Sequence, residues 1–196
     1  MIVTFKSFVE TIQESQEHTS AGTSLNQVSS GIKHATAKGL IKPHSINVDN
    51  GGGKYDLGKS HVEKHIKGAH MEVHDPYNRS KEHNDSVKKK AKGKADYVGM
   101  HNVLNVIKEP KARHDAIKST KSFMKPKTGI AHFTVYEGDK TGKGRVSKAD
   151  KGKGSSWQEH RPTSSYVHEI KKVFPEKTHD VTAKGPHIIV RHKGQS

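Results

Sequence analysis

The chain contains no cysteine, which excludes a disulfide framework, a thiolate nucleophile and a cysteine-ligated zinc site. This absence fits a cytoplasmic protein. Hydrophobic residues make up only 30% and aromatic residues 6% of the 196 residues, a length that still allows a real core. No apolar run approaches a membrane span, and residues 1–9 are too short and mixed for a signal peptide. We therefore expect no membrane association.

Acidic residues are also scarce, with 20 Asp and Glu against 35 Lys and Arg, so the formal net charge is +15. A balance of this size favours a polyanionic partner, most often nucleic acid. The charge is concentrated in residues 88–94 and in the glycine-rich segment 138–156, which we expect to be a long loop. Such runs are usually solvated surface; the alternative is contact with phosphate groups.

Segment 138–156 ends beside Trp157, the only tryptophan in the chain. An aromatic ring beside a cationic loop could stack on a nucleic-acid base, or it could anchor the loop to the core. We take Lys143, Arg145 and Trp157 as the candidate substrate-binding residues.

The most informative motif is Ser-Ile-Asn-Val-Asp-Asn-Gly-Gly-Gly-Lys-Tyr-Asp, residues 45–56. An alternating strand ends at Asp49 and runs through three glycines into a helix-like segment, residues 58–67. In an α/β sheet this arrangement presents bare backbone to a nucleotide-like ligand. Gly51 and Gly53 would supply the tight turn and the close approach. The alternative is a flexible glycine hairpin.

Hydrophobic spacing predicts strands that alternate with helices after residue 40. The strands are expected over residues 45–49, 70–74, 97–100, 130–136 and 187–191. The helices are expected over residues 58–67, 80–91, 113–124 and 164–174. This alternation predicts an α/β fold, with a mostly parallel sheet and helices on both faces. Helical spacing at residues 5–12 and 25–35 suggests an N-terminal helical appendage over residues 1–40, followed by the α/β domain over residues 41–196.

The order of these features resembles the class I S-adenosylmethionine-dependent methyltransferases, over roughly residues 45–191. The shared series is the glycine turn, an acidic residue after the second strand, an Asp-aromatic-Val strand, and Met-Lys-Pro-Lys-Thr-Gly before a long strand. The resemblance implies a Rossmann-like fold, a methyltransferase activity and S-adenosylmethionine as the cofactor. Residues 75–95 leave room for a helix but hardly for a further strand, so we expect the sheet to lack one strand.

The resemblance also implies the cofactor site. Asp49, Gly51 and Gly53 match the family pattern Asp-x-Gly-x-Gly, and Asp75 stands where an acidic residue usually holds the ribose hydroxyls. The implied cofactor-binding residues are Asp49, Gly51, Gly52, Gly53, Tyr55, Asp75, Tyr77 and Asn102. Asp75-Pro-Tyr-Asn also looks like the Asp-Pro-Pro-Tyr motif of methyltransferases that act on bases, but its place after the second strand does not suit that role.

Candidate catalytic residues are His101, Asn102 and Glu137, because ligand sites gather where parallel strands end. A general base is needed only if the methyl acceptor must lose a proton. The alternative for His101 is a partly buried, hydrogen-bonding histidine. His61 and His65 have the spacing of a zinc pair, but the motif His-Glu-x-x-His is absent and the chain holds 16 histidines, so we expect no metal.

We therefore expect methyl transfer from S-adenosylmethionine, with nucleic acid as the favoured acceptor and a protein or small molecule as competitors. The alternative is a non-enzymatic, basic phage virion or internal head protein that binds DNA. Residues 4–9 are similar to the opening of internal head proteins of large tailed bacteriophages, which implies a phage-encoded protein in the host cytoplasm or the virion. A histidine-based nuclease is a third possibility.

Overall fold

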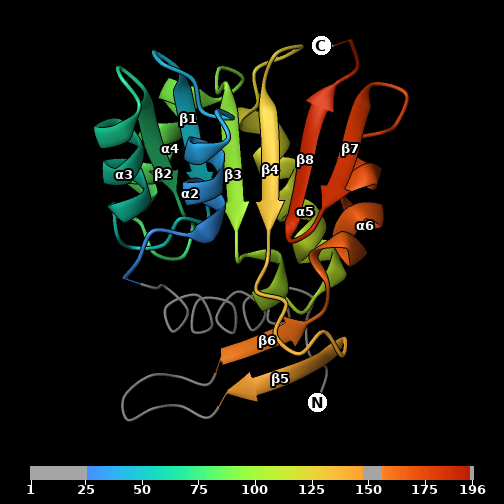
Figure 1. Ribbon diagram of the computed structural model, residues 1–196. Coiled ribbons are helices and arrows are strands. Elements are labelled where there is room, and N and C mark those ends of the chain that lie inside the picture. Colours follow the sequence, from blue (N-terminus) through green and yellow to red (C-terminus); the bar gives the residue numbers. More distant parts are fainter. Residues whose placement is uncertain (1–25, 148–155, 195–196) are drawn as a thin grey trace, which may run out of the picture.

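The computed structural model describes residues 26–147 and 156–194. Figure 1 shows three layers, with helices α2 and α3 on one face of a central sheet and α4, α5 and α6 on the other. The sheet has six strands in the order β2-β1-β3-β4-β8-β7. Strands β1 to β4 are parallel, and β8 runs antiparallel to both of its neighbours, β4 and β7. The predicted Rossmann-like, mostly parallel sheet is confirmed.

The elements follow the predicted order closely. The strands of the central sheet are β1 (Ile46–Asn50), β2 (His70–His74), β3 (Tyr97–His101), β4 (Ile130–Thr134), β7 (His179–Lys184) and β8 (His187–His192). The α-helices are α2 (Ser30–Ala37), α3 (Leu57–His65), α4 (Lys81–Ala91), α5 (Pro110–Phe123) and α6 (Val167–Val173). The structure also contains two short 3₁₀ helices, η1 (Leu104–Val106) and η2 (Thr163–Tyr166).

Local sequence explains several helix boundaries. Ser80 caps α4 by accepting a hydrogen bond from the His83 N–H at 3.2 Å, and Ser29 caps α2 in the same way. Lysines lie in the last turn of α4, where positive charge interacts favourably with the helix dipole. Pro110 begins α5, at a position where the missing N–H costs nothing.

Each face of the sheet has its own hydrophobic core. The larger core lies under α4, α5 and α6 and includes Val87, Ile117, Phe123, Phe133, Ile170 and Phe174. The smaller core lies under α2 and α3 and includes Ile32, Ala35, Val62, Met71 and Tyr97. Helix α2 therefore packs against the sheet. The helix predicted over residues 5–12 lies outside the described residues, so a boundary near residue 40 stays a prediction.

The sheet ends at β2, as the short spacing between residues 75 and 95 predicted. That segment holds α4 and no further strand. Side chains cover part of the open edge: Glu63 Oε1 accepts from the Met71 N–H at 3.3 Å, and His83 Nε2 lies 2.7 Å from the Val73 carbonyl. Such caps protect an edge strand from pairing with another chain.

The expectation of a long loop over residues 138–156 was wrong for residues 143–147 and 156, which lie in strands, whereas residues 148–155 lie outside the described residues. The segment contributes to a two-stranded antiparallel hairpin of β5 (Lys143–Ser147) and β6 (Ser156–His160). In Figure 1 this hairpin lies apart from the central sheet, beyond the carboxyl ends of β3 and β4. Among the described residues, no helix is both long and apolar enough to cross a membrane.

Candidate functional site

A cavity of about 1220 Å³ opens at the carboxyl ends of strands β1 to β4. Its wall contains the glycine turn, the turn after β2, the end of β3 and the segment after β4. The predicted residues that line it are Asp49, Gly51, Gly52, Gly53, Tyr55, Asp75, Tyr77, His101, Asn102 and Glu137. The fold thus brings every predicted cofactor-binding and catalytic residue to one cavity. A typical ligand pocket occupies about 300–1,000 Å³, so the space is large enough for a cofactor and part of a second molecule.

The glycine turn has little room for side chains. Gly51 and Gly53 adopt φ angles of 89° and 74°, in the left-handed region. A Cβ atom on Gly51 would lie 2.4 Å from Val103 Cγ2, and one on Gly52 would lie 2.7 Å from Asp49 Oδ2. The turn therefore requires glycine both for its conformation and for its close contact with the cavity wall.

Asp49 is the last residue but one of β1, next to this turn, and is only 7% exposed. Burial, together with the charge of Asp75, raises the pKa of Asp49 to about 7, although Arg79 acts in the opposite direction. Asp49 lines the cavity. A cationic or hydrogen-bonding group in the cavity would therefore find an acceptor here.

Asp75 has a different environment. Its carboxylate accepts hydrogen bonds from the N–H groups of Gly53 (2.8 Å), Tyr77 (2.9 Å) and Asn78 (2.9 Å), and from Asn78 Nδ2 (3.2 Å). Arg79 strengthens the same junction, since its Nε donates to the Gly53 carbonyl at 2.8 Å. Asp75 thus joins the glycine turn to the turn after β2. Its predicted contact with a ribose stays a prediction, and a ribose hydroxyl would share acceptors already in use.

His101 and Asn102 follow each other at the end of β3. Asn102 adopts a φ of 59°, a left-handed conformation that asparagine tolerates better than most residues. His101 is 6% exposed; its Nε2 lies 3.0 Å from the Tyr97 hydroxyl, and its Nδ1 lies 3.0 Å from Thr134 Oγ1. Burial lowers the pKa of His101 to about 3. These contacts favour the alternative interpretation, a buried hydrogen-bonding histidine, over a general base acting alone.

Glu137 lies three residues beyond the end of β4. Its carboxylate accepts from the Thr163 N–H at 2.7 Å and pairs with Lys140 Nζ at 2.9 Å. Burial by itself would raise the pKa of Glu137, but the bonds from Thr163 and Lys140 outweigh it and lower that pKa. Glu137 is therefore held as an anion at the cavity wall.

The predicted substrate-binding residues lie on the β5–β6 hairpin and not in the cavity wall. Lys143 and Arg145 are exposed, and Arg145 pairs with Asp139. Trp157 pairs across the hairpin with Val146, and its ring fills the space that a Cβ on Gly144 would need. The neighbouring Gln158 does line the cavity, a contact that the sequence did not indicate.

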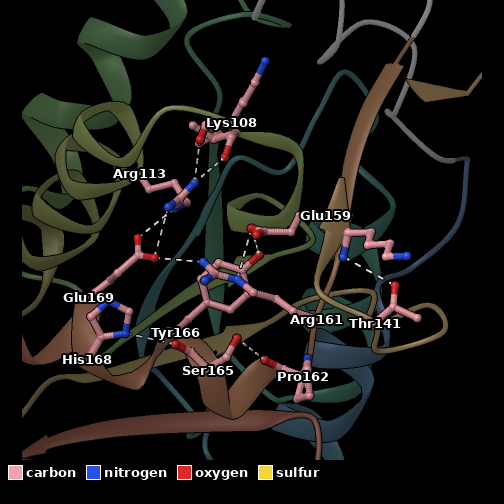
Figure 2. A network of polar contacts seen from close by, with 12 residues as sticks. Lys108, Arg113, Thr141, Glu159, Arg161, Pro162, Ser165, Tyr166, His168 and Glu169 are labelled. Atoms are coloured by element: carbon pink, nitrogen blue, oxygen red, sulfur yellow. Dashed lines mark hydrogen bonds and ion pairs between the residues drawn. The ribbon is translucent and has the colours of Figure 1, made fainter. Parts of the chain in front are cut away.

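A network of ion pairs anchors the base of this hairpin, as Figure 2 shows. The guanidinium of Arg113 on α5 pairs with both oxygens of Glu169 on α6, at 2.7 and 3.1 Å. Arg161, directly after β6, pairs with Glu169 at 2.8 Å and with Glu159 at 3.1 Å. Arg161 also lies over the Tyr166 ring, 3.7 Å from its centroid. The network ties the hairpin to the α5 and α6 side of the domain.

The histidine pair with the spacing of a zinc site is the remaining candidate. His61 and His65 do lie together on α3, with ring centroids 4.3 Å apart. Within residues 26–147 and 156–194, however, no group of three or more potential ligands is placed to hold a metal ion.

The sequence did not indicate the apolar cavity wall, which is formed by Val28, Ile32, Val103, Val106 and Ile107. Their spacing indicated helices and turns but not which side would face a ligand.

No family model matches this sequence, and no curated protein matches it. The fold is similar to that of solved methyltransferase structures. A 1,6-didemethyltoxoflavin-N1-methyltransferase of Burkholderia thailandensis, solved with 1,6-didemethyltoxoflavin and S-adenosylhomocysteine bound, has 12% identity and a TM-score of 0.52 over 94% of this chain and 84% of that one. The CcbJ methyltransferase of Streptomyces caelestis has 9% identity and a TM-score of 0.52 over 91% of this chain and 98% of that one. DesVI of Streptomyces venezuelae has 12% identity and a TM-score of 0.52 over 98% of this chain and 100% of that one.

Proposed function

We propose that this protein is an S-adenosylmethionine-dependent methyltransferase. The observation that carries the proposal is the glycine turn at the carboxyl end of β1, whose bare backbone and buried Asp49 face a cavity large enough for a cofactor and an acceptor. The fold supports it, because the similar Burkholderia thailandensis structure holds S-adenosylhomocysteine.

The residues of the cavity fit this cofactor in charge and shape. The Asp49 carboxylate suits the cationic amino-acid end of the cofactor, and the Gly51–Gly53 backbone allows close approach. Tyr77 and Asn102 line the same cavity and could contact the nucleoside portion. When bound, the cofactor supplies an activated methyl group on a sulfonium. The protein then has to hold the acceptor in line with that methyl and keep water out. Asn102 and Glu137 are the polar cavity residues that we propose orient the acceptor.

Nucleic acid is the acceptor class that we favour. The net charge of +15 and the exposed Lys143 and Arg145 beside the cavity support a polyanionic substrate. The exposed Tyr136 at the cavity wall and Trp157 on the hairpin offer rings for stacking on bases. A basic DNA-binding virion protein that uses the same fold without catalysis is the competing proposal. The phage origin rests on residues 4–9, which lie outside the described residues.

Calorimetric titration with S-adenosylhomocysteine tests the proposal. We expect micromolar binding in the wild-type protein, and loss of that binding in Gly51→Val, whose side chain would collide with Val103. Asp49→Ala should also lose it, because the charged acceptor is removed. Circular dichroism would establish that both variants keep the fold.

Absence of heat from a folded wild-type protein would reject the methyltransferase proposal. The DNA-binding alternative predicts instead a strongly salt-dependent affinity for DNA that Asp49→Ala and Gly51→Val leave unchanged.

A further inference from the structure

A chain of hydrogen bonds runs from the cavity to the molecular surface beside α2. It begins at His101, which lines the cavity, and continues through Tyr97 and His132 to His187. Tyr97 Oη lies 3.0 Å from His101 Nε2 and 2.9 Å from His132 Nδ1, and His132 Nε2 lies 3.0 Å from His187 Nδ1. Tyr97 and His132 are completely buried, whereas His187 is partly exposed. The chain therefore connects two environments, one at each end.

Two glycines reserve the space that this chain occupies. Gly99 lies between Tyr97 and His101 on β3, and a Cβ there would come within 2.5 Å of His101 Nε2 and 3.1 Å of Tyr97 Oη. Gly31, on α2, would place a Cβ 2.1 Å from His101 Nδ1. Since glycine inside a helix or strand lowers its stability, both positions favour the placement of the His101 ring over local secondary structure.

The surroundings keep the rings of this chain neutral. Burial, and after it the neighbouring histidines, lower the pKa of His132 to about 2. His34 from α2 stacks on His187 with centroids 3.7 Å apart, and Arg191 from β8 adds positive charge near His132. Burial, and after it the charge of Asp49, raise the pKa of Tyr97, so its hydroxyl keeps its proton. An extra positive charge is therefore disfavoured at every buried member.

A neutral imidazole has one donor and one acceptor nitrogen, and a tyrosine hydroxyl donates once. The chain can therefore satisfy all its bonds in only two ways. In the outward arrangement, Thr134 donates to His101 Nδ1 and each group donates to the next one toward His187. In the inward arrangement every donor and acceptor is exchanged.

We propose that Tyr97, His101, His132 and His187 form a proton relay between the cavity and the solvent. A proton released in the cavity binds His101 Nδ1 in place of the Thr134 hydroxyl. The Nε2 proton of His101 then passes to Tyr97, the phenol proton to His132 Nδ1, the Nε2 proton of His132 to His187 Nδ1, and the Nε2 proton of His187 to water.

Each group in this shift forms one bond to hydrogen and breaks one, so no charge accumulates and nothing is oxidised or reduced. The groups must turn back before the next cycle. The relay rests on the proposed methyltransferase function only for the source of the proton, which is an N–H or O–H methyl acceptor.

Nuclear magnetic resonance of the full-length protein with ¹⁵N-labelled histidine tests the relay without any substrate. We expect the ring nitrogens of His101, His132 and His187 to exchange between their protonated and unprotonated states. Tyr97→Phe removes the central hydroxyl and should abolish this exchange. A single fixed tautomer for all three rings in the wild-type protein would overturn the proposal.

Because Tyr97 is buried, its replacement can disturb the fold, so a second variant at another position tests the relay independently. His187→Gln, at the partly exposed end, keeps a hydrogen-bonding partner for His132 but cannot pass a proton, so exchange should again be lost. His192 lies on the same strand but is not part of the proposed relay, so His192→Gln should leave the exchange intact. Exchange that persists in His187→Gln contradicts a relay that reaches the surface.

A kinetic test separates this inference from the proposed function. With a methyl acceptor in hand, His187→Gln should slow turnover by about 10²-fold, the usual size of a lost proton-transfer step, and added imidazole should restore it. S-adenosylhomocysteine affinity should not change. A protein that binds no S-adenosylhomocysteine yet shows tautomer exchange would refute the methyltransferase and leave the relay standing; the converse result would refute the relay alone.

Discussion

Asp49, near the end of β1, and Asp75, directly after the neighbouring β2, face the same cavity, but their carboxylates have different surroundings. Asp75 accepts three backbone hydrogen bonds and a fourth from the Asn78 side chain, whereas burial and the charge of Asp75 raise the pKa of Asp49 to about 7. The difference arises because N–H groups of both the glycine turn (Gly53) and the turn after β2 (Tyr77 and Asn78) point at Asp75. The surrounding backbone thus decides whether a carboxylate organises the site or remains available to a ligand.

The raised pKa of Asp49 makes the stability of the protein depend on pH. In the unfolded chain the pKa is 3.8, and in the folded protein it is about 7, so between these values only the folded state holds the proton. The contribution of this group is fully present below pH 3.8 and is lost as the pH rises through 7, by up to about 1.4 kcal/mol per pH unit. We expect Asp49→Asn to remove this dependence and to be more stable than wild type at pH 8.

Urea denaturation at pH 5, 6, 7 and 8 measures this prediction, and the informative quantity is the difference between the variant and the wild type. Other titrating groups contribute equally to both proteins, so they cancel in that difference. A difference that stays constant across the series would mean that Asp49 titrates as in the unfolded chain.

At the level of secondary structure, the pair between Arg113 and Glu169 holds α5 to α6 and to the hairpin base. Arg113 is 7% exposed and donates as well to the carbonyls of Ile107 (2.9 Å) and Lys108 (2.8 Å). Breaking a buried pair by removing one partner typically costs about 3–5 kcal/mol, and we expect a loss of this size in Arg113→Met. Chemical denaturation would measure it.

Lys111→Met on the same helix is the matched control. Lys111 pairs with Asp115 at 3.5 Å, but its side chain is 91% exposed, so we expect a change within about 0.5 kcal/mol. Equal losses in the two variants would show that the buried network adds nothing beyond ordinary surface charge.

The same network explains why the hairpin was not predicted. Strands β1 to β4 have apolar alternation or apolar runs, and α4 has a serine cap and inward Val87, so local sequence was sufficient to predict them. The hairpin has a glycine- and lysine-rich strand β5, and an isolated hairpin is marginal in water. Its support comes from Glu169 and Tyr166, residues outside the hairpin that no local pattern connects to it.

The candidate site likewise has one part that local sequence predicts and one part that it does not. The glycine turn and Asp49 are consecutive in sequence and could be predicted. The chain from His101 to His187 could not, because Tyr97, His132 and His187 meet only through the register of β3, β4 and β8. Its nearest local signal is the i, i+4 spacing of Tyr97 and His101 around Gly99, which places all three on one face of β3.

For the molecule as a whole, the net charge of +15 does not say which surface meets a polyanion. The two basic clusters belong to different parts of the fold: residues 88–94 include the end of α4, whereas Lys143 and Arg145 lie on the hairpin beyond the opposite end of the sheet (Figure 1). Only the hairpin is next to the cavity, since Gln158 of β6 lines it. If the acceptor is a nucleic acid, the hairpin must make the contacts that position it.

Salt dependence of binding to a single-stranded oligonucleotide distinguishes the two clusters. Each phosphate contact contributes about 0.7 to the slope of log affinity against log salt, so losing two contacts in Lys143→Gln/Arg145→Gln should make that slope shallower by about 1.4. Lys89→Gln/Lys92→Gln on the α4 side removes the same charge from exposed positions and should leave the slope nearly unchanged. Equal effects from both pairs would mean that the whole basic surface attracts the strand without orienting it, and the hairpin would then have no special role in presenting a base to the cavity.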